Sequence, residues 1–179
     1  MKKLTLLRHA KSAWDDPVQR DFDRPLNRRG RRAAQTIGRE MRSLGLGFDQ
    51  VIASPAVRVM ETLRDVADGY GRPLEAQYDK RIYLAATETL LEVIHGADDG
   101  NDRLLIVGHN PGLEKLALML TRGTGLRAEI AIKYPTATLA EIDLPAPRWS
   151  EVAEGTGTIA RFIRPRDLDP ELGPDEESY

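Results

Sequence analysis

Short runs rich in apolar residues alternate with polar segments along this chain, and their lengths predict strands. Three of the runs have the apolar character of strands buried on both faces of a parallel sheet. Two later runs alternate apolar and polar positions, and one short run has the composition of an edge strand. In chain order the predicted strands are 3–7, 49–53, 74–78, 103–107, 138–142 and 158–163.

Helical spacing of apolar residues fills most of the segments between these strands. Apolar residues recur every three or four positions, as one buried face of a helix requires. Asn27 is the predicted N-cap of the first helix, and Ser54, with Pro55 at the first helical position, is the predicted N-cap of the second. The predicted buried positions are Ala34, Ile37, Met41 and Leu44 in the first helix, Met60, Leu63, Ala67 and Tyr70 in the second, and Leu113, Leu116 and Leu120 in a later one, with a short helix at 87–95.

This alternation of strands and helices predicts an α/β fold: a three-layer sandwich with a mostly parallel central sheet flanked by helices. Residues 12–26 are polar and contain prolines without a periodic pattern, so they predict a surface loop. Residues 1–164 are expected to form a single domain. Residues 165–179 form an acidic, proline-containing tail with few residues to bury, which is expected to be mobile or loosely docked.

Composition narrows the function further. The 179 residues carry a net charge of −2 and contain 41% hydrophobic residues. This balance disfavours a general nucleic-acid binder, and no apolar stretch is long enough for a membrane span or a signal peptide. The absence of cysteine excludes disulfides and thiolate catalysis. We therefore expect a cytoplasmic protein with neither membrane nor nucleic acid as a partner.

Histidine and arginine residues follow three of the predicted strands. Arg8 and His9 follow the first, Arg58 lies in the first turn of the helix after the second, and His109 follows the run at 103–107. Because the carboxyl ends of parallel strands open on one edge of a sheet, these side chains are expected to converge. Arginine forks and imidazoles suit a tetrahedral phosphoryl dianion. The sequence therefore predicts a strongly cationic phosphoryl site. Its residues are Arg8, His9, Arg58 and His109.

These residues, with the segments around them, resemble the histidine phosphatase superfamily, the phosphoglycerate-mutase-like group. The finer pattern resembles its short SixA-type phosphohistidine phosphatases, over about residues 3–143. The matching motifs are Leu7-Arg8-His9-Ala10-Lys11-Ser12, Asp23-Arg24-Pro25-Leu26, Arg29-Gly30, Ser54-Pro55-Ala56-Val57-Arg58 with Thr62, Gly108-His109-Asn110-Pro111 and Tyr134-Pro135-Thr136-Ala137.

The resemblance implies an enzyme that transfers the phosphoryl group in two steps, without a metal ion or another cofactor. His9 would attack phosphorus as a neutral imidazole and water would then release phosphate. The second nitrogen of His9 would need an acceptor, for which a main-chain carbonyl is expected. Arg8 and Arg58 would hold two phosphoryl oxygens, and His109, if protonated, would donate to another. The expected substrate is a phosphohistidine-bearing protein.

The chain departs from larger members of the superfamily where these carry an acidic proton donor. In the corresponding stretch, residues 81–88, no carboxylate aligns, because Glu88 comes slightly late. An alkoxide leaving group needs a proton, whereas the leaving nitrogen of phosphohistidine can already be protonated, so the departure favours phosphohistidine. The chain also lacks large insertions that would form a lid, which favours a protein substrate.

Two other functions stay open at this point. One is a phosphatase acting on small phosphate esters, nucleotides or pyrophosphates. The other is a catalytically silent phosphate-binding module, against which the presence of a potential nucleophile counts.

Several further polar residues have weaker signals. Lys11, Ser12 and Arg24 are candidates for phosphate binding, although Arg24 could equally pair with a neighbouring aspartate. His95, at the end of a predicted helix, is expected to be structural. The loop carboxylates are expected to form a solvated face and not a metal site: Asp15, Asp16, Asp21 and Asp23.

Overall fold

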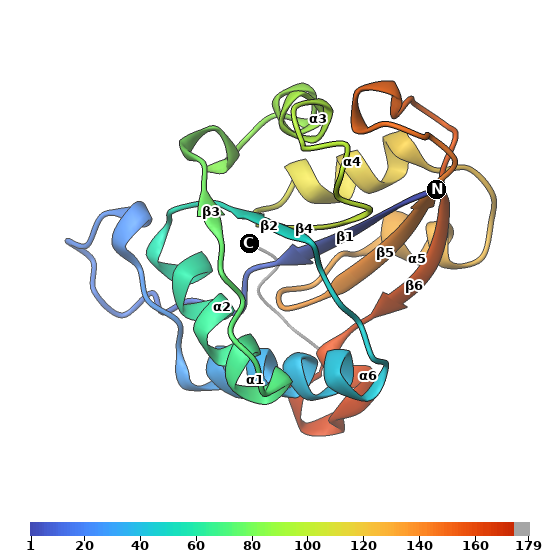
Figure 1. The fold of residues 1–179 in the computed structure, drawn as a ribbon. Coiled ribbons are helices and arrows are strands. Elements are labelled where there is room, and N and C mark those ends of the chain that lie inside the picture. The colour runs from blue at the N-terminus through green and yellow to red at the C-terminus, as the bar shows by residue number, and fades with distance from the viewer. Residues whose placement is uncertain (174–179) are drawn as a thin grey trace.

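Six strands form one sheet in the computed structural model, which describes residues 1–173 (Figure 1). They are β1 (Lys2–Arg8), β2 (Gln50–Ala53), β3 (Gln77–Tyr78), β4 (Arg103–Gly108), β5 (Leu139–Leu144) and β6 (Thr158–Ile163). The strand order is β3-β2-β4-β1-β5-β6. β1, β2, β3 and β4 are parallel, whereas β5 and β6 join as antiparallel strands. The predicted mostly parallel sheet is confirmed, and the predicted edge strand is reduced to two residues.

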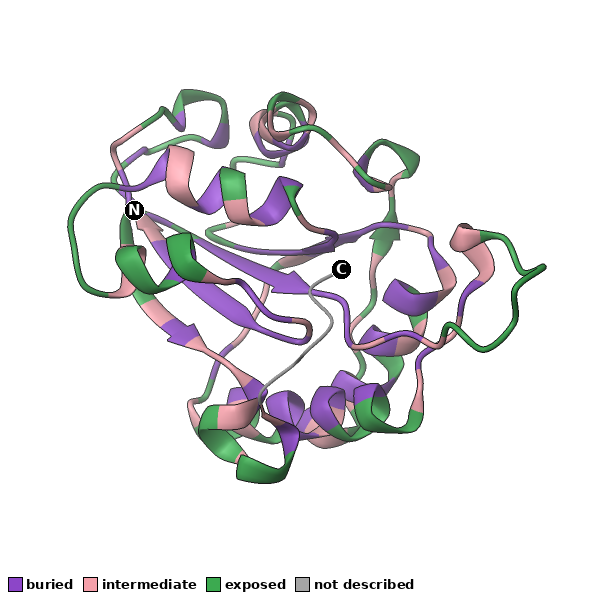
Figure 2. Ribbon diagram, turned by 180° about the vertical axis from the view of Figure 1, so that it is seen from behind, coloured by how far each residue is buried: buried purple, intermediate pink, exposed green. Residues whose placement is uncertain are grey.

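Helices cover both faces of the sheet, which confirms the three-layer architecture (Figures 1 and 2). On one face lie α1 (Arg28–Ser43), α2 (Val57–Tyr70) and the short α6 (Pro165–Leu168). On the other lie α3 (Thr87–His95), α4 (Gly112–Leu120) and α5 (Leu126–Ile132). Within residues 1–173, no helix is both long and apolar enough to cross a lipid bilayer.

The central strand β1 is buried on both faces, as its apolar run requires. Leu4 and Leu6 belong to the core beneath α3 and α4, whereas Leu7 belongs to the core shared with α1 and α2. All three side chains are fully buried. This alternation fixes the register of β1, because a slip by one residue would exchange its two faces. The strand end that carries Arg8 and His9 is thereby held in place.

The start and the buried face of α2 differ from prediction. The helix begins at Val57, so Ser54 lies outside it and does not cap it. Met60, predicted to be buried, is 45% exposed, and Val59 is buried instead. Val59 precedes the buried Leu63 by four positions and Met60 precedes it by three, so helical spacing allows either residue to share its face. Tertiary packing decides which of the two is buried. The predicted cap of α1 is confirmed, because Asn27 accepts a hydrogen bond from the Gly30 amide at 2.8 Å.

Helices α1 and α2 approach so closely that only glycine fits at their crossing. A Cβ on Gly38 would lie 2.1 Å from the Val66 carbonyl oxygen, and a Cβ on Gly69 would lie 2.1 Å from the Gln35 carbonyl oxygen. Each distance is far below van der Waals contact. The two glycines thus let one backbone pack directly on the other, and they set the position of the helix that carries Arg58.

We expect Gly38→Ala to lower the free energy of unfolding by about 1–3 kcal/mol, because the added methyl group must push the two helices apart. In an exposed helix the same substitution would stabilise the protein. Gly96→Ala is the matched control, since its Cβ would meet no atom closer than 3.6 Å. Urea denaturation measures both variants, and a Gly38→Ala protein as stable as the parent would contradict the close packing.

The segment after β6 is more ordered than its composition predicted. Residues 165–168 form α6, and a 3₁₀ turn follows at Pro170–Leu172. Arg32 of α1 forms ion pairs with Asp169 and Glu171, and Leu172 is buried against the α1 and α2 core. Residues 165–172 are therefore docked on α1, where ion pairs and one apolar side chain supply the attachment; how tightly they are held stays a prediction. The rest of the tail, residues 174–179, lies outside the described part of the chain.

Candidate active site

The carboxyl ends of three neighbouring strands bring the two predicted histidines together. His9 follows β1 and His109 follows β4, and these strands are paired along their length. The two imidazole rings lie 5.3 Å apart between centroids. Arg58, on the first turn of α2 after β2, places a guanidinium nitrogen 3.3 Å from Nδ1 of His109. The predicted convergence is therefore present in the structure.

His9 is buried and its ring is oriented by a main-chain carbonyl, as predicted. Nδ1 lies 2.7 Å from the carbonyl oxygen of Ala10 and donates its proton to it. In the neutral ring the lone pair is then on Nε2. Burial lowers the pKa of His9 well below its usual value of 6.5, and the charged forms of His109, Arg8 and Arg58 would each lower it further. At neutral pH His9 thus carries an unprotonated nitrogen, which is what a nucleophile requires.

His109 is held from both ring nitrogens. Nε2 lies 2.7 Å from the hydroxyl oxygen of Ser54, and Nδ1 accepts a hydrogen bond from Arg58. Burial and the charge of Arg58 lower the pKa of His109 to about 3. The sequence-based expectation was that His109 would donate to the phosphoryl group if protonated. In this structure the ring is neutral above pH 3, so the condition is unmet unless a bound dianion raises its pKa.

The low pKa values of the two histidines make stability depend on pH. The unfolded chain protonates both rings near pH 6.5, whereas the folded protein keeps them neutral to lower pH. The contribution of the two neutral histidines to the free energy of unfolding is therefore fully present above pH 6.5, and it is lost as the pH falls toward 3. We expect the free energy of unfolding to fall between pH 6.5 and 4.5 by up to about 1.4 kcal/mol per pH unit for each histidine.

Urea denaturation at pH 5 and pH 7 measures this dependence. The double variant His9→Gln/His109→Gln should show a flatter profile between these values. An unchanged slope in the double variant would show that other groups cause the dependence.

Arg58 is fixed by an aspartate that sequence reasoning assigned to a solvated face. Asp21, in a 3₁₀ turn at Asp21–Asp23, accepts hydrogen bonds from Arg58 at its carbonyl oxygen, at 2.7 Å, and at its carboxylate, at 3.0 Å. Burial alone would raise the pKa of Asp21, but hydrogen bonds from Tyr83 and Arg24 and the charge of Arg58 lower it to about 2. Asp21 is thus ionised at neutral pH. Its only sequence signal is its place in the loop that follows the first strand.

Tyr83 is the second residue that the sequence did not reveal. Its hydroxyl donates to the Asp21 carboxylate at 2.5 Å, and its ring meets the His109 ring edge to face, with centroids 5.4 Å apart. It comes from residues 81–88, the stretch in which no aligned acid was found. A single tyrosine in a short stretch between a strand and a helix gives no pattern that separates this position from a packing or surface one.

Arg8 is buried at the end of β1, where its guanidinium donates to the carbonyl oxygen of Tyr134 at 2.9 Å. The amide of Asn110 donates to the same oxygen at 3.0 Å. The motif around Tyr134 and the motif around His109 therefore meet at Arg8. These hydrogen bonds connect the segment around Tyr134 to the end of β1 and to the segment after β4, although the three are far apart in sequence.

Two of the three candidates for additional phosphate binding, Ser12 and Arg24, contact each other. Arg24 donates to the hydroxyl of Ser12 and forms an ion pair with Asp21 at 2.9 Å, so the pairing considered for it is present. Lys11 lies beside a separate basic pocket. A role of Lys11, Ser12 or Arg24 in phosphate binding stays a prediction. His95 lies outside the site, with Nε2 2.8 Å from the Val152 carbonyl oxygen.

Two glutamates lie in the first turns of the helices that follow Tyr83 and His109. Glu88 is exposed on the first turn of α3. Glu114, on the first turn of α4, is partly buried; burial raises its pKa, which Arg8 and Lys115 lower in part. Across residues 1–173, no three acidic or histidine side chains are grouped closely enough to hold a metal ion.

Comparisons with known proteins find relatives by sequence and by structure. Residues 4–83 match the sequence model of the "Histidine phosphatase superfamily (branch 1)". An uncharacterized protein of Mycobacterium tuberculosis is 36% identical over 164 residues, which cover 89% of this chain and all of that protein.

Two solved structures share the fold. A SixA protein from Agrobacterium tumefaciens, proposed to be a phosphohistidine phosphatase, is 29% identical, with a TM-score of 0.75 over 90% of this chain and 97% of that one. The protein histidine phosphatase SixA complexed with tungstate is 21% identical, with a TM-score of 0.76 over 93% and 99% of the two chains. At that identity the second likeness concerns the fold alone.

Proposed function

Because the chain belongs to the histidine phosphatase superfamily and is a phosphatase, we propose that it hydrolyses phosphohistidine through a phosphorylated His9. The observation that carries the proposal is the hydrogen bond from Nδ1 of His9 to the Ala10 carbonyl oxygen. It leaves Nε2 as the nitrogen with a lone pair, in a buried site beside two arginines. The likeness to the Agrobacterium tumefaciens SixA protein supports the substrate class.

In the first step the Nε2 lone pair of His9 forms a bond to phosphorus while the bond from phosphorus to the substrate nitrogen breaks. That nitrogen keeps the bonding electrons and leaves as a neutral imidazole if its ring was protonated beforehand. Arg8 and Arg58 hold the non-bridging oxygens, on which negative charge is spread. In the second step water attacks the phosphorus on His9, the bond from Nε2 to phosphorus breaks, and inorganic phosphate departs.

The carboxyl groups considered as proton donors favour a substrate whose leaving group does not need a proton from the enzyme. Asp21, with a pKa of about 2, cannot donate a proton at neutral pH, and Glu88 is exposed. Phosphohistidine does not need a proton from the enzyme if its leaving ring is already protonated, whereas an alkyl ester does. Additional contacts to the phosphorylated partner would come from Lys11, Ser12 and Arg24. That the protein is cytoplasmic stays a prediction.

A second candidate function is hydrolysis of small phosphate esters. The observation that favours it is Glu114, a partly buried carboxyl group whose pKa is raised by burial and which interacts electrostatically with Arg8. If Glu114 supplied a proton to an alkoxide, the preference for phosphohistidine would be lost.

A substrate comparison separates the two functions. Without an enzymatic acid, we expect kcat/KM for an alkyl phosphate such as glycerol phosphate to be at least about 100-fold below that for a phosphohistidine-bearing domain, because general acids contribute about 100-fold or more. Glu88→Gln and Glu114→Gln should both leave the phosphohistidine rate within about twofold. An alkyl ester preferred by the parent, or a large loss in either variant, would contradict the proposal.

A further inference from the structure

Ser54 does not cap α2, yet its side chain is completely buried beside the proposed phosphoryl site. Its amide donates to the Val107 carbonyl oxygen at 3.1 Å, which extends the pairing of β2 with β4 by one residue. These two strands also lead into Arg58 and His109. The register of the sheet therefore holds the Ser54 side chain against the His109 ring.

The Ser54 hydroxyl has two hydrogen-bonding neighbours within residues 1–173. Its oxygen accepts a hydrogen bond from the Ala56 amide at 3.3 Å and lies 2.7 Å from Nε2 of His109. An amide nitrogen cannot accept the hydroxyl proton, whereas an unprotonated imidazole nitrogen can. Nε2 of His109 is therefore the acceptor that this buried hydroxyl needs.

Arg58 makes the opposite demand on the same ring. Its guanidinium lies 3.3 Å from Nδ1 of His109 and donates to the lone pair there. A neutral imidazole carries one proton, so the proton is then on Nε2 and points at the Ser54 oxygen. In that tautomer the Ser54 hydroxyl proton has no acceptor among the described residues, which is unfavourable in a buried site.

The hydrogen bond from Arg58 to His109 is the weaker of these two contacts. At 3.3 Å it is longer than the 2.7 Å between Nε2 and the Ser54 oxygen. Asp21 holds Arg58 separately, through hydrogen bonds at 2.7 and 3.0 Å. Arg58 is thus kept in position even when Nδ1 no longer accepts its proton.

A phosphoryl oxygen bound next to Arg58 and His109 would satisfy all three residues. The oxygen accepts from the Arg58 guanidinium, and it also accepts from Nδ1 once the ring proton is there. Nε2 then carries the lone pair and accepts the Ser54 hydroxyl proton. Burial and the charge of Arg58 lower the pKa of His109 to about 3, which keeps the ring neutral in the free protein. A neutral ring with its proton on Nδ1 is still a donor.

We propose that Ser54 is a positioning residue, which holds neutral His109 in the tautomer whose Nδ1 proton points at the phosphoryl group. The inference rests on the proposed function, because it needs a phosphoryl-binding site at His9. When the anion binds, Nε2 loses its proton to water and Nδ1 gains one from water, so the charge of the ring does not change. Ser54 keeps its own proton and turns it toward Nε2. His109 thereby donates without the protonation that the sequence-based expectation required.

Nitrogen NMR of protein labelled with ¹⁵N-histidine tests the tautomer directly, at neutral pH in the unaltered chain. The signals that vanish in His109→Ala belong to His109, and their couplings to the ring protons distinguish Nδ1 from Nε2. We expect the unprotonated nitrogen to be Nδ1 in the free protein and Nε2 with saturating orthovanadate. An unchanged tautomer, or a ring protonated on both nitrogens in the vanadate complex, would overturn the inference.

A double-mutant cycle tests whether Ser54 acts through His109. We expect Ser54→Ala to lower kcat/KM for a phosphohistidine-bearing domain by about 5- to 10-fold, the scale of one neutral hydrogen bond. In a His109→Ala background the same substitution should change kcat/KM by less than about twofold, since the ring that Ser54 orients is gone. An equal loss in both backgrounds would indicate a structural role and overturn the inference, as would a parental kcat/KM in Ser54→Ala.

The matched control is Thr121, whose buried hydroxyl donates to the Ala117 carbonyl oxygen at the end of α4. Thr121→Val also removes one buried hydroxyl, and it should leave kcat/KM and the effect of vanadate on His109 unchanged. A loss of kcat/KM as large as that in Ser54→Ala would overturn the inference, because the removal of any buried hydroxyl would then be enough.

The inference and the proposed function fail in different ways. Phosphorylation of His9 during turnover without a change of tautomer at His109 would refute the inference alone. A chain that binds vanadate with the expected change of tautomer, yet does not hydrolyse phosphohistidine, would refute the proposed function and leave the role of Ser54 standing.

Discussion

Replacing His9 with alanine is expected to lower kcat on a phosphohistidine-bearing domain by about 10,000-fold or more, the scale seen when a covalent nucleophile is removed from an enzyme. Nε2 of this ring is the proposed site of phosphoryl transfer, and the water reaction that would remain lacks the two-step route. Because Arg8, Arg58 and His109 still form the anion site, the substrate should continue to bind. Steady-state kinetics and vanadate calorimetry measure the two effects separately.

The control for this variant is the third histidine. His95 bonds to the Val152 carbonyl oxygen away from the site, so His95→Ala should keep kcat within about twofold. A His9→Ala protein that retains more than about 1% of the parental kcat would show that another residue accepts the phosphoryl group.

Replacing Arg58 with alanine is expected to reduce kcat/KM by about 100- to 1000-fold, the cost of removing one preorganised donor from a transition-state site. Arg58 is buried and held by Asp21 through two hydrogen bonds, so little reorganisation accompanies the reaction. Arg58→Lys should recover only part of this loss, because an ammonium group lacks the planar fork.

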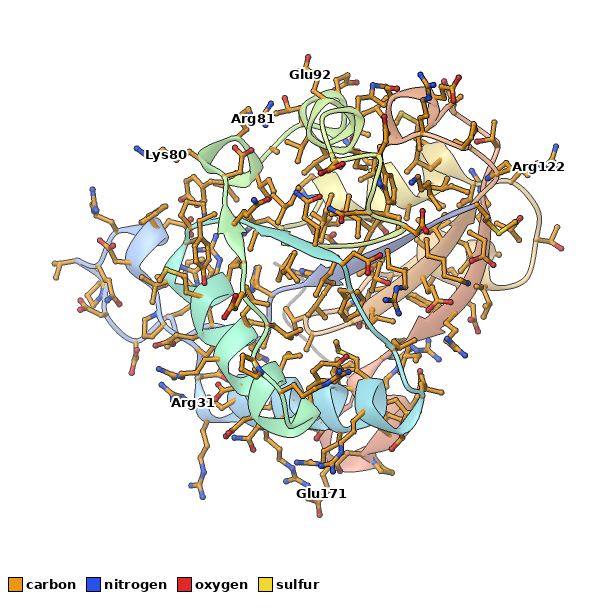
Figure 3. All side chains as sticks on the ribbon, viewed as in Figure 1. Arg31, Lys80, Arg81, Glu92, Arg122 and Glu171 are labelled. Carbon is orange, nitrogen blue, oxygen red and sulfur yellow. The ribbon has the colours of Figure 1, made fainter. Side chains whose placement is uncertain are left out.

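The matched control is Arg81, an exposed arginine paired with Asp79 and directed away from the molecule in Figure 3. Arg81→Ala should leave kcat/KM unchanged. The decisive reading is the rate of Arg58→Ala relative to the parent. A parental kcat/KM in Arg58→Ala would contradict the role of this arginine as a phosphoryl clamp, and full recovery in Arg58→Lys would show that a point charge is enough.

The parts of the fold that the sequence predicted are those governed by burial and local chemistry. The apolar run that became β1 was recognisable because it is buried on both faces, and Asn27 was recognisable because a side-chain cap has a local sequence signal. The convergence of Arg8, His9, Arg58 and His109 followed from a general property of parallel sheets, which open at their carboxyl edge.

The residues that were missed depend on contacts between distant segments. Met60 and Val59 fit the same helical repeat, and only the packing against α1 and the sheet decides which is buried. Asp21 and Tyr83 have ordinary loop surroundings in sequence, yet they meet beside Arg58 in space. The segment at 165–172 has an acidic composition typical of a mobile tail, but Arg32 supplies partners that composition alone does not reveal.

A rapid-quench experiment shows whether His9 carries the phosphoryl group during turnover. The protein is mixed with a limiting amount of ³²P-labelled phosphohistidine domain, quenched in alkali within one turnover, and digested, and the labelled peptide is identified. We expect an acid-labile, alkali-stable phosphoryl group on the peptide that contains His9, and none in His9→Ala. Phosphate released from the parent in one step, or label on any other residue, would contradict this expectation.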